Sequence, residues 1–196
     1  MKKLVVATRN RGKIKEIQAL LDGIVDTVIC SADVAGFPDT VEDGETFEEN
    51  ALKKAREASM FTGQHALADD SGLVVDALNG CPGVYSARYA GEGAGDVANN
   101  TKLLEDLKGV ETDKRQAAFI CVLAYVSPDG FERTFTGRIG GRILDMAQGS
   151  GGFGYDPLFL VDGFDRAMAE LELEEKNEIS HRGQAFRQFL KYLKEK

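Results

Sequence analysis

Two adjacent carboxylates directly after an apolar run are the first residues in this sequence that could do chemistry. Asp69 and Asp70 follow Ala66-Leu67-Ala68 and precede Ser71-Gly72. Carboxylate oxygens at a strand end are ligands that hard cations such as Mg2+ prefer, and a carboxylate can also take a proton from water. If the strand continues through the pair, the two side chains point to opposite faces, so only one can point into a given site. The alternative is an Asp-rich turn whose carboxylates cap backbone amides.

The charge along the chain is distributed in a way that suits a metal-bound polyphosphate. Residues 1–15 contain six basic side chains and no acidic one, whereas residues 39–49 contain six acidic side chains and no basic one. A metal-bound polyphosphate needs cations for its phosphates and carboxylates for its metal. Glu42, in the acidic segment, is a candidate second metal ligand. The alternatives are two solvated charged faces and, for Glu42, a solvated loop acid.

The basic segment at the N-terminus contains candidate phosphate-binding groups. Thr8-Arg9-Asn10-Arg11-Gly12-Lys13 lies between an expected strand over residues 3–8 and an expected helix over residues 12–21. In open α/β sheets, ligands bind at the edge where strands end and helices begin. The helix amides, the Thr8 hydroxyl, the Asn10 amide and the Lys13 ammonium could therefore face a phosphate. A solvated turn with lysines at a helix start explains the same residues.

Two segments near the C-terminus could recognise a nucleotide base. Gly152-Phe153-Gly154-Tyr155-Asp156-Pro157 places an aromatic ring on a flexible backbone, which can stack on a base, and its Asp156 could accept hydrogen bonds from base N–H groups. Ser180-His181-Arg182-Gly183 opens an expected helix, and its Arg182 offers several donors to a carbonyl or phosphate. The alternatives are a glycine-rich turn with Phe153 in the core, a His181 bonded to backbone and, for Lys176, a solvated helix lysine.

Several other kinds of protein are disfavoured. The sequence has no G-x-S-x-G motif and no complete Walker A loop, and its glycine-rich residues 149–154 precede an expected strand, unlike a Rossmann fingerprint. The net charge of −8 argues against a nucleic-acid or membrane partner. No apolar run is long enough for a membrane span or a signal peptide, and the three scattered cysteines suit a reducing compartment. We therefore expect a cytoplasmic protein.

The elements that must position these residues indicate one α/β domain with a mixed sheet, residues 1–196. Strand, helix and strand within the first 30 residues are typical of a βαβ unit. Thr46 and Glu49 form a capping box that predicts a helix start, and Gly63 predicts its end. Residues 116–127 are apolar on both faces, as in a central strand, and residues 128–130 predict a hairpin turn.

The remaining elements follow from the same patterns. Asp96 can cap a helix, and Ser180 is the expected N-cap of the last one. The expected strands span residues 3–8, 25–30, 65–69, 72–78, 116–127, 131–139 and 158–161. The expected helices span residues 12–21, 46–63, 97–107, 167–176 and 180–194.

Taken together, six segments of the chain resemble the inosine triphosphate pyrophosphatase family, also called non-standard purine nucleoside triphosphate pyrophosphatases. They occur in the family's order over nearly the whole chain, and six short motifs in order are far more specific than any one of them. The matching segments are Ala7-Thr8-Arg9-Asn10-Arg11-Gly12-Lys13, Thr46-Phe47-Glu48-Glu49-Asn50-Ala51, Ala68-Asp69-Asp70-Ser71-Gly72-Leu73, Pro82-Gly83-Val84-Tyr85-Ser86-Ala87-Arg88-Tyr89, Gly151-Gly152-Phe153-Gly154-Tyr155-Asp156-Pro157 and Ser180-His181-Arg182-Gly183.

The resemblance implies an enzyme that uses Mg2+ to hydrolyse ITP, dITP, XTP or dXTP to the nucleoside monophosphate and pyrophosphate, which removes deaminated purines from the nucleotide pool. It implies a homodimer and an elongated mixed β-sheet flanked by helices, with two lobes around a central substrate cleft. It assigns Asp70 as general base and metal ligand, with Glu42 and Asp69 as further metal ligands. The phosphate- and substrate-binding residues that it implies are Thr8, Arg9, Asn10, Arg11, Gly12, Lys13, Ser71 and Lys176; the base-binding residues are Phe153, Gly154, Tyr155, Asp156, His181 and Arg182.

The chemistry of the bases agrees with this assignment in part. Hypoxanthine and xanthine carry a 6-oxo group, so a donor from Arg182 or His181 would favour them over adenine, whose 6-amino group is itself a donor. The same donor does not reject guanine. Two alternatives stay open: a house-cleaning pyrophosphatase for other modified nucleotides, and a non-catalytic purine nucleotide sensor. Loss of Asp70 or Lys13 would mark the sensor, and both residues are present.

Overall fold

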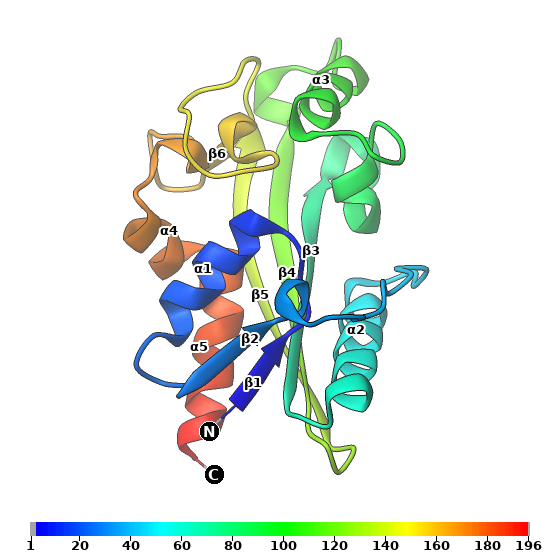
Figure 1. The fold of residues 1–196 in the computed structure, drawn as a ribbon. Coiled ribbons are helices and arrows are strands. Elements are labelled where there is room, and N and C mark those ends of the chain that lie inside the picture. The colour runs from blue at the N-terminus through cyan, green and yellow to red at the C-terminus, as the bar shows by residue number, and fades with distance from the viewer. Residues whose placement is uncertain (1–2, 196) are drawn as a thin grey trace. The chain divides into compact units, whose positions relative to one another are not determined.

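The computed structural model describes residues 3–195, which form an α/β fold around a six-stranded mixed sheet (Figure 1). The strand order is β2-β1-β3-β4-β5-β6. β1 pairs in parallel with β2 and β3, whereas β5 and β6 are antiparallel. This confirms the predicted fold class. The strands are β1 Lys3–Val6, β2 Thr27–Cys30, β3 Ala66–Val75, β4 Gln116–Val126, β5 Glu132–Ile143 and β6 Phe159–Val161; the helices are α1 Arg11–Leu21, α2 Phe47–Thr62, α3 Asp96–Asp106, α4 Leu173–Ile179 and α5 His181–Lys194.

The described chain divides into two compact units. Unit 1 contains residues up to Asp70, residues 121–136 and residues from 185 onwards. Unit 2 contains residues 71–120 and 137–184. Strands β3, β4 and β5 each contribute residues to both units. No helix in the described range 3–195 is long and apolar enough to cross a membrane.

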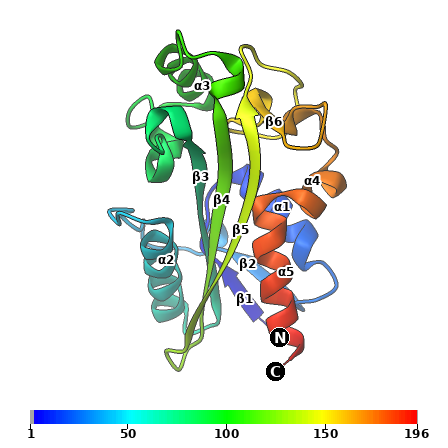
Figure 2. The ribbon, with the colours of Figure 1, turned by 180° about the vertical axis from the view of Figure 1, so that it is seen from behind.

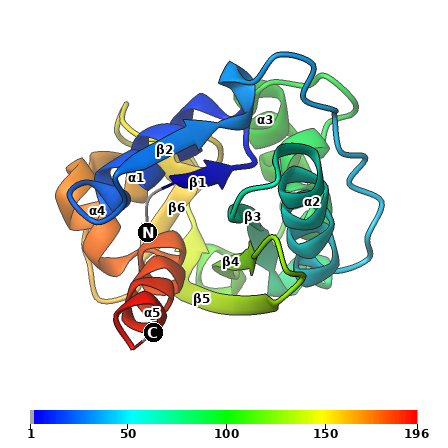
Figure 3. The same cartoon turned by 60° about the horizontal axis from the view of Figure 1, so that its bottom comes forward.

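In unit 1, helices cover both faces of the sheet, as Figures 2 and 3 show for α2 on one side and α1 with α5 on the other. Successive β1 side chains alternate between the two faces: Leu4 and Val6 belong to a core cluster with residues of α1 and α5, whereas Val5 belongs to a cluster with residues of α2. In β3, Leu67 lies on the first face and Ala66 and Ala68 on the second. This alternation decides where the next two side chains of β3 point.

Helix α2 begins and ends where its sequence predicts. The Thr46 side chain accepts from the Glu49 amide, and the Glu49 side chain accepts from the Thr46 amide, which completes the capping box. Gly63 ends the helix in the left-handed conformation at φ 64°, which costs glycine little because it has no Cβ. The helix start, which positions the polar residues of its first two turns, is therefore set by local sequence.

Unit 2 has its own hydrophobic core. Leu73 and Val75 from the end of β3 pack with Leu103 of α3, Phe159 of β6 and the ring of Tyr155. A short turn, Met168–Glu170, and helix α4 lead into α5, where the Ser180 hydroxyl accepts from the Gly183 amide at 3.1 Å and so caps the helix as expected. The final turn of unit 2 therefore places His181 and Arg182 at the start of a helix.

Three predictions about elements were wrong. The strands expected on either side of Asp69-Asp70-Ser71-Gly72 are one continuous strand, because these polar side chains find partners on neighbouring helices. The helix expected over residues 167–176 is a short turn followed by α4, which begins only at Leu173. Asp96 does not cap α3; it is the first helical residue, and its carboxylate instead accepts from the Gly154 amide.

Candidate active site

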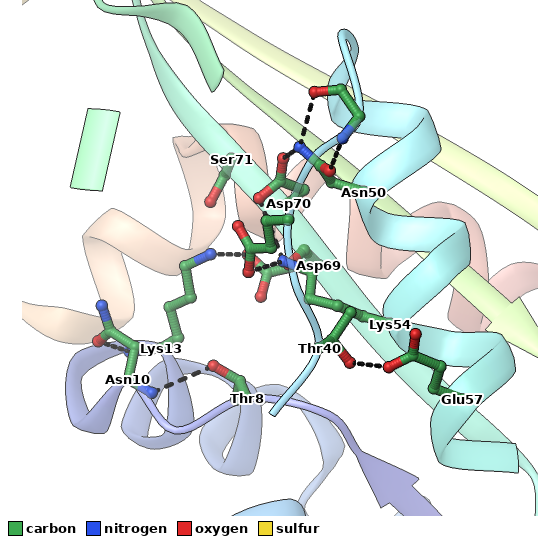
Figure 4. Close-up of polar contacts among 12 residues, drawn as sticks. Thr8, Asn10, Lys13, Thr40, Asn50, Lys54, Glu57, Asp69, Asp70 and Ser71 are labelled. Carbon is green, nitrogen blue, oxygen red and sulfur yellow. Dashed lines mark hydrogen bonds and ion pairs between the residues drawn. The ribbon is translucent and has the colours of Figure 1, made fainter. Parts of the chain in front are cut away.

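The adjacent carboxylates Asp69 and Asp70 lie on opposite faces of β3 and meet lysines from different helices (Figure 4). Asp69 follows Leu67 on the face of α1, and its Oδ2 lies 3.0 Å from Lys13 Nζ. Asp70 follows Ala68 on the face of α2, and its Oδ1 lies 3.1 Å from Lys54 Nζ. Both carboxylates are buried. Because β3 continues through the pair, the side-chain period of the strand separates the two acids.

The Lys54 ammonium donates hydrogen bonds to three oxygens. Besides Asp70 Oδ1, it donates to Glu42 Oε1 at 3.0 Å and to the Asp69 backbone oxygen at 2.8 Å. Glu42 is thus brought to Asp70 from the acidic segment through a shared cation, although 28 residues separate them in the sequence. Beside Lys54, Asn50 Nδ2 donates to Asp70 Oδ2 at 3.2 Å. Each oxygen of the Asp70 carboxylate therefore has its own donor.

The electrostatics of this cluster favour a proton acceptor at Asp70. Burial raises the pKa of the Asp70 carboxyl; Lys54 and Lys13 lower it and Glu42 raises it, so that burial dominates. Burial alone would lower the pKa of Lys54, but the three nearby carboxylates outweigh it and raise the pKa, which keeps the ammonium charged. A carboxylate with a raised pKa is a better general base than an ordinary aspartate.

In the loop before α1, most of the side chains predicted to bind phosphate already form hydrogen bonds or ion pairs within the protein. Asn10 is the N-cap of α1, and its Oδ1 accepts from the amides of Gly12 and Lys13 at 2.9 and 3.1 Å. The Thr8 hydroxyl accepts from the Asn10 amide at 3.3 Å. Arg9 donates to the Phe37 backbone oxygen and pairs with Asp39. Arg11 is exposed as the first residue of α1.

A second cluster forms within unit 2, around Phe153. Lys176 Nζ lies 2.6 Å from Asp156 Oδ2, and both side chains are buried. The same Asp156 oxygen accepts from the Phe153 amide at 2.9 Å. The Lys176 ammonium lies 4.8 Å from the centroid of the Phe153 ring. Lys176, predicted with the phosphate-binding residues, therefore lies with the residues predicted for the base.

The start of α5 completes this second cluster. Arg182, only 1% exposed, donates to the Ser71 hydroxyl at 2.8 Å and lies 5.6 Å from the Phe153 ring centroid. The His181 ring stacks on Phe119 at 4.9 Å between centroids. The Phe153 ring is half-buried and belongs to no core cluster, so it is not the core anchor considered as an alternative. It offers an aromatic face flanked by two cations.

The side chain of Tyr155, predicted with the base-binding residues, lies in the core of unit 2. Its ring is 3% exposed within the core of unit 2, and its hydroxyl donates to the Ser86 backbone oxygen at 2.8 Å. The ring therefore packs against the core, and the role of Tyr155 in base binding stays a prediction. Gly154 is held by α3, because its amide donates to Asp96 and its carbonyl accepts from Asn100 at 3.0 Å.

The first cluster consists of the polar side chains around Asp70, namely Lys13, Glu42, Asn50, Lys54, Asp69 and Asp70. Of these, Asn50 and Lys54 are the residues whose roles the sequence did not predict. A signal for them existed, because both fall on the helix face that carries Ala51, Ala55 and Ala58. A polar side chain at a position where helical periodicity demands an apolar one is buried, and a buried polar group needs a partner.

The fold and these clusters define an α/β protein with a buried carboxylate–lysine site of the kind that suits phosphate chemistry. A model of the Ham1 family matches residues 4–192, and the chain belongs to this family. It is 60% identical to a dITP/XTP pyrophosphatase of Geobacter sulfurreducens over 185 residues, covering 94% of this chain and 93% of the relative. It is 52% identical to a dITP/XTP pyrophosphatase of Desulforamulus reducens over 191 residues, covering 97% and 95%.

Solved structures agree with these relatives. A HAM1 protein from Coxiella burnetii is 43% identical with a TM-score of 0.89, and the match covers 100% of both chains. A dITP/XTP pyrophosphatase from Mycobacterium abscessus is 44% identical with a TM-score of 0.78, covering 96% of this chain and 98% of that one. The resemblance drawn from the six sequence segments is thereby confirmed.

Proposed function

We propose that the protein hydrolyses the non-standard purine nucleoside triphosphates ITP, dITP, XTP and dXTP to the monophosphate and pyrophosphate, and so clears deaminated purines from the nucleotide pool. The observation that carries the proposal is the Asp70 carboxylate held between Lys54 and Asn50 beside Glu42. The names of the close relatives, dITP/XTP pyrophosphatase, supply the substrate class.

In the proposed reaction, Asp70 accepts a proton from the water that attacks the α-phosphorus. The new bond joins the water oxygen to that phosphorus, and the bond to the oxygen that bridges the α- and β-phosphorus breaks, releasing pyrophosphate. Lys13 lies on the other face of β3, where its ammonium can stabilise negative charge that develops on the leaving group. Burial supports this role of Asp70, because it raises the pKa of the carboxyl.

We propose Mg2+ as the cofactor, with Glu42 and Asp70 as its protein ligands. Within residues 3–195, no three His, Cys, Asp or Glu side chains are grouped so that they could hold a metal ion by themselves. Mg2+ is usually held by one or two carboxylates together with substrate phosphates, so this pair fits the ion as a donor set. Two lysines also leave the three carboxylates of the cluster with one excess negative charge. When bound, the ion would neutralise phosphate charge. The Asp69 carboxylate, predicted as a third ligand, pairs with Lys13, and its ligand role stays a prediction.

We propose that Phe153 stacks on the base and that Arg182 and His181 recognise its 6-oxo group. The support is the half-buried Phe153 ring and the buried Arg182 guanidinium near it. Lys176 and Asp156, already paired with each other, would hold the residues around Phe153 in shape. A donor at the 6-position would disfavour adenine, because its amino group would leave two donors facing each other.

Product analysis tests the function directly. The protein is incubated with Mg2+ and, in parallel, ITP, XTP, dITP, GTP or ATP, and the products are separated by ion-exchange chromatography. We expect monophosphate and pyrophosphate from the inosine and xanthosine substrates, and little product from ATP or GTP. Binding without turnover would identify a sensor instead, and release of single phosphates would contradict the proposed water attack at the α-phosphorus.

We further propose that the protein acts as a homodimer in the cytoplasm, as the family resemblance implies. Light scattering coupled to size-exclusion chromatography measures the mass directly. A mass of one 21.3 kDa chain at working concentration would contradict the dimer.

A further inference from the structure

Asn50 is a fully buried amide that connects two parts of the first cluster (Figure 4). It lies in the first turn of α2 and is 0% exposed. Its Oδ1 accepts from the Gly44 amide at 2.8 Å, and its Nδ2 donates to Asp70 Oδ2 at 3.2 Å and to the Gly44 carbonyl at 3.5 Å. One side chain thus contacts both the acidic segment and the carboxylate of β3.

These contacts determine which way the amide faces. The Gly44 N–H can only donate, so the acceptor Oδ1 must face it, and the donor Nδ2 is left for Asp70. Because Lys54 donates to Asp70 Oδ1, the two carboxylate oxygens are held from two separate residues of α2. A carboxylate held at both oxygens cannot rotate about its χ2 bond without losing a hydrogen bond.

The segment at Gly44 is built around this amide. A Cβ at Gly44 would lie 2.7 Å from Asn50 Oδ1 and 2.8 Å from the Glu49 Cβ, closer than any side chain tolerates, so the backbone can approach Asn50 only through a glycine. Gly44 is two residues from Glu42, which shares the Lys54 ammonium with Asp70. Asn50 therefore fixes the path of the backbone that carries Glu42.

We propose that Asn50 is a positioning residue for the reaction: it orients the Asp70 carboxylate toward the attacking water and holds Glu42 in register with it. The inference rests on the proposed function. It concerns a residue that is fully buried and acts through Asp70 and the Gly44 backbone. Loss of a group that orients a carboxylate in this way typically lowers activity about 10- to 100-fold.

Two substitutions separate the two contacts. Asn50→Ala removes both, whereas Asn50→Asp keeps an acceptor for the Gly44 amide and removes the Nδ2 donor that faces Asp70 and, at 3.5 Å, the Gly44 carbonyl. Asn99 is a matched control in unit 2, because it is 4% exposed and likewise bridges backbone groups, accepting from the Ala90 amide at 2.8 Å and donating to the Ala87 oxygen at 3.2 Å. Neither Ala87 nor Ala90 is among the predicted site residues.

The experiment measures kcat and KM for dITP, together with hydrogen exchange at the Gly44 amide. For both Asn50 variants we expect kcat to fall by roughly 10- to 100-fold, with KM changed by less than about threefold. Gly44 exchange should accelerate in Asn50→Ala and stay slow in Asn50→Asp. The variants Asn99→Ala and Asn99→Asp should keep kcat within about threefold of the wild-type protein, even if they unfold at a lower temperature.

The possible outcomes are distinct. An Asn50→Asp protein that folds and turns over dITP at the wild-type rate overturns the positioning role. Equal losses of kcat in the Asn50 and Asn99 variants also overturn it, because they would show a general effect of losing a buried amide. If the wild-type protein itself releases no pyrophosphate from any substrate of the panel, the proposed function fails and the assignment of Asn50 fails with it.

Discussion

Replacing Lys54 by methionine tests the electrostatic argument for the active site most severely. Methionine keeps most of the side-chain volume and removes the ammonium that holds Glu42, Asp70 and the Asp69 carbonyl. The neighbouring residue Lys53 is a matched control on the same helix, because it pairs with Asp43 at 2.6 Å through side chains that are 35% and 66% exposed. Lys54 and Asp70 are only 10% and 7% exposed.

The magnitude follows from burial. Removing one partner of a buried ion pair costs about 3–5 kcal/mol, because the other charge stays buried and unpaired. Glu42 is 32% exposed and can turn to solvent, so we take the lower end, about 3 kcal/mol. For a chain of this length, each kcal/mol moves the melting temperature by about 2–4 °C, which predicts a loss of roughly 6–12 °C for Lys54→Met. An exposed pair such as Lys53–Asp43 contributes little, so Lys53→Met should lose far less.

The pH dependence has a definite sign. Burial already raises the pKa of Asp70, and Lys54→Met removes the largest influence that lowers it. A carboxyl whose pKa is higher in the folded than in the unfolded state destabilises the fold above its folded pKa, and the penalty disappears as the pH falls. The stability difference between the wild-type protein and Lys54→Met should therefore shrink as the pH is lowered from neutral.

Urea unfolding of both lysine variants measures the loss in free energy of unfolding, and thermal unfolding measures the loss in melting temperature. Circular dichroism follows both, because the chain has no tryptophan to serve as a fluorescent probe. The reasoning is refuted if Lys54→Met loses no more stability than Lys53→Met. It is equally refuted if the loss in Lys54→Met grows on acidification, since that would require Asp70 to be charged more easily without its lysine.

Three further predictions concern the reaction. Asp70→Asn should abolish pyrophosphate release from dITP while its circular dichroism spectrum stays that of the wild-type protein; normal rates would remove Asp70 from the mechanism. Phe153→Ala should raise KM for every base by roughly 5- to 150-fold, because base–aromatic stacking is worth about 1–3 kcal/mol; an unchanged KM in steady-state assays would show that the ring does not stack. Arg182→Ala should reduce the preference for ITP over ATP, measured as the ratio of kcat/KM values, by roughly 5- to 150-fold; an unaltered ratio would place base selection elsewhere.

The parts of the fold that the sequence predicts well depend on local signals. The capping box at Thr46 and Glu49, the left-handed Gly63 and the apolar run 116–126 each determine their element without distant partners. β3 is different. Asp69-Asp70-Ser71-Gly72 has the composition of a turn, and it continues a strand because Lys13, Lys54 and Arg182 supply charges to its polar side chains.

The candidate site also contains residues that local sequence indicates and residues that only tertiary structure identifies. Motif resemblance predicts roles for Asp70, Phe153 and Arg182, and also for Tyr155, which lies inside a matching segment. Its ring packs in the core of unit 2, and a sequence motif does not distinguish a side chain that touches a ligand from one that supports the loop. For Asn50 and Lys54, the register of the apolar face of α2 indicates burial, but their partners Asp70, Glu42 and Gly44 are brought to them only by the tertiary structure.

The adjacency of Asp69 and Asp70 also limits which mutations the gene can accept. A point substitution in β3 changes one group, but a one-codon insertion or deletion within residues 66–68 would reverse the facing of every residue after it. The Asp69 carboxylate, which now faces α1, would then face α2. Apolar side chains of β3 such as Leu67 would likewise point away from the core cluster in which they pack. Changes of length should therefore accumulate in exposed connections such as residues 22–24, while β3 evolves by replacement alone.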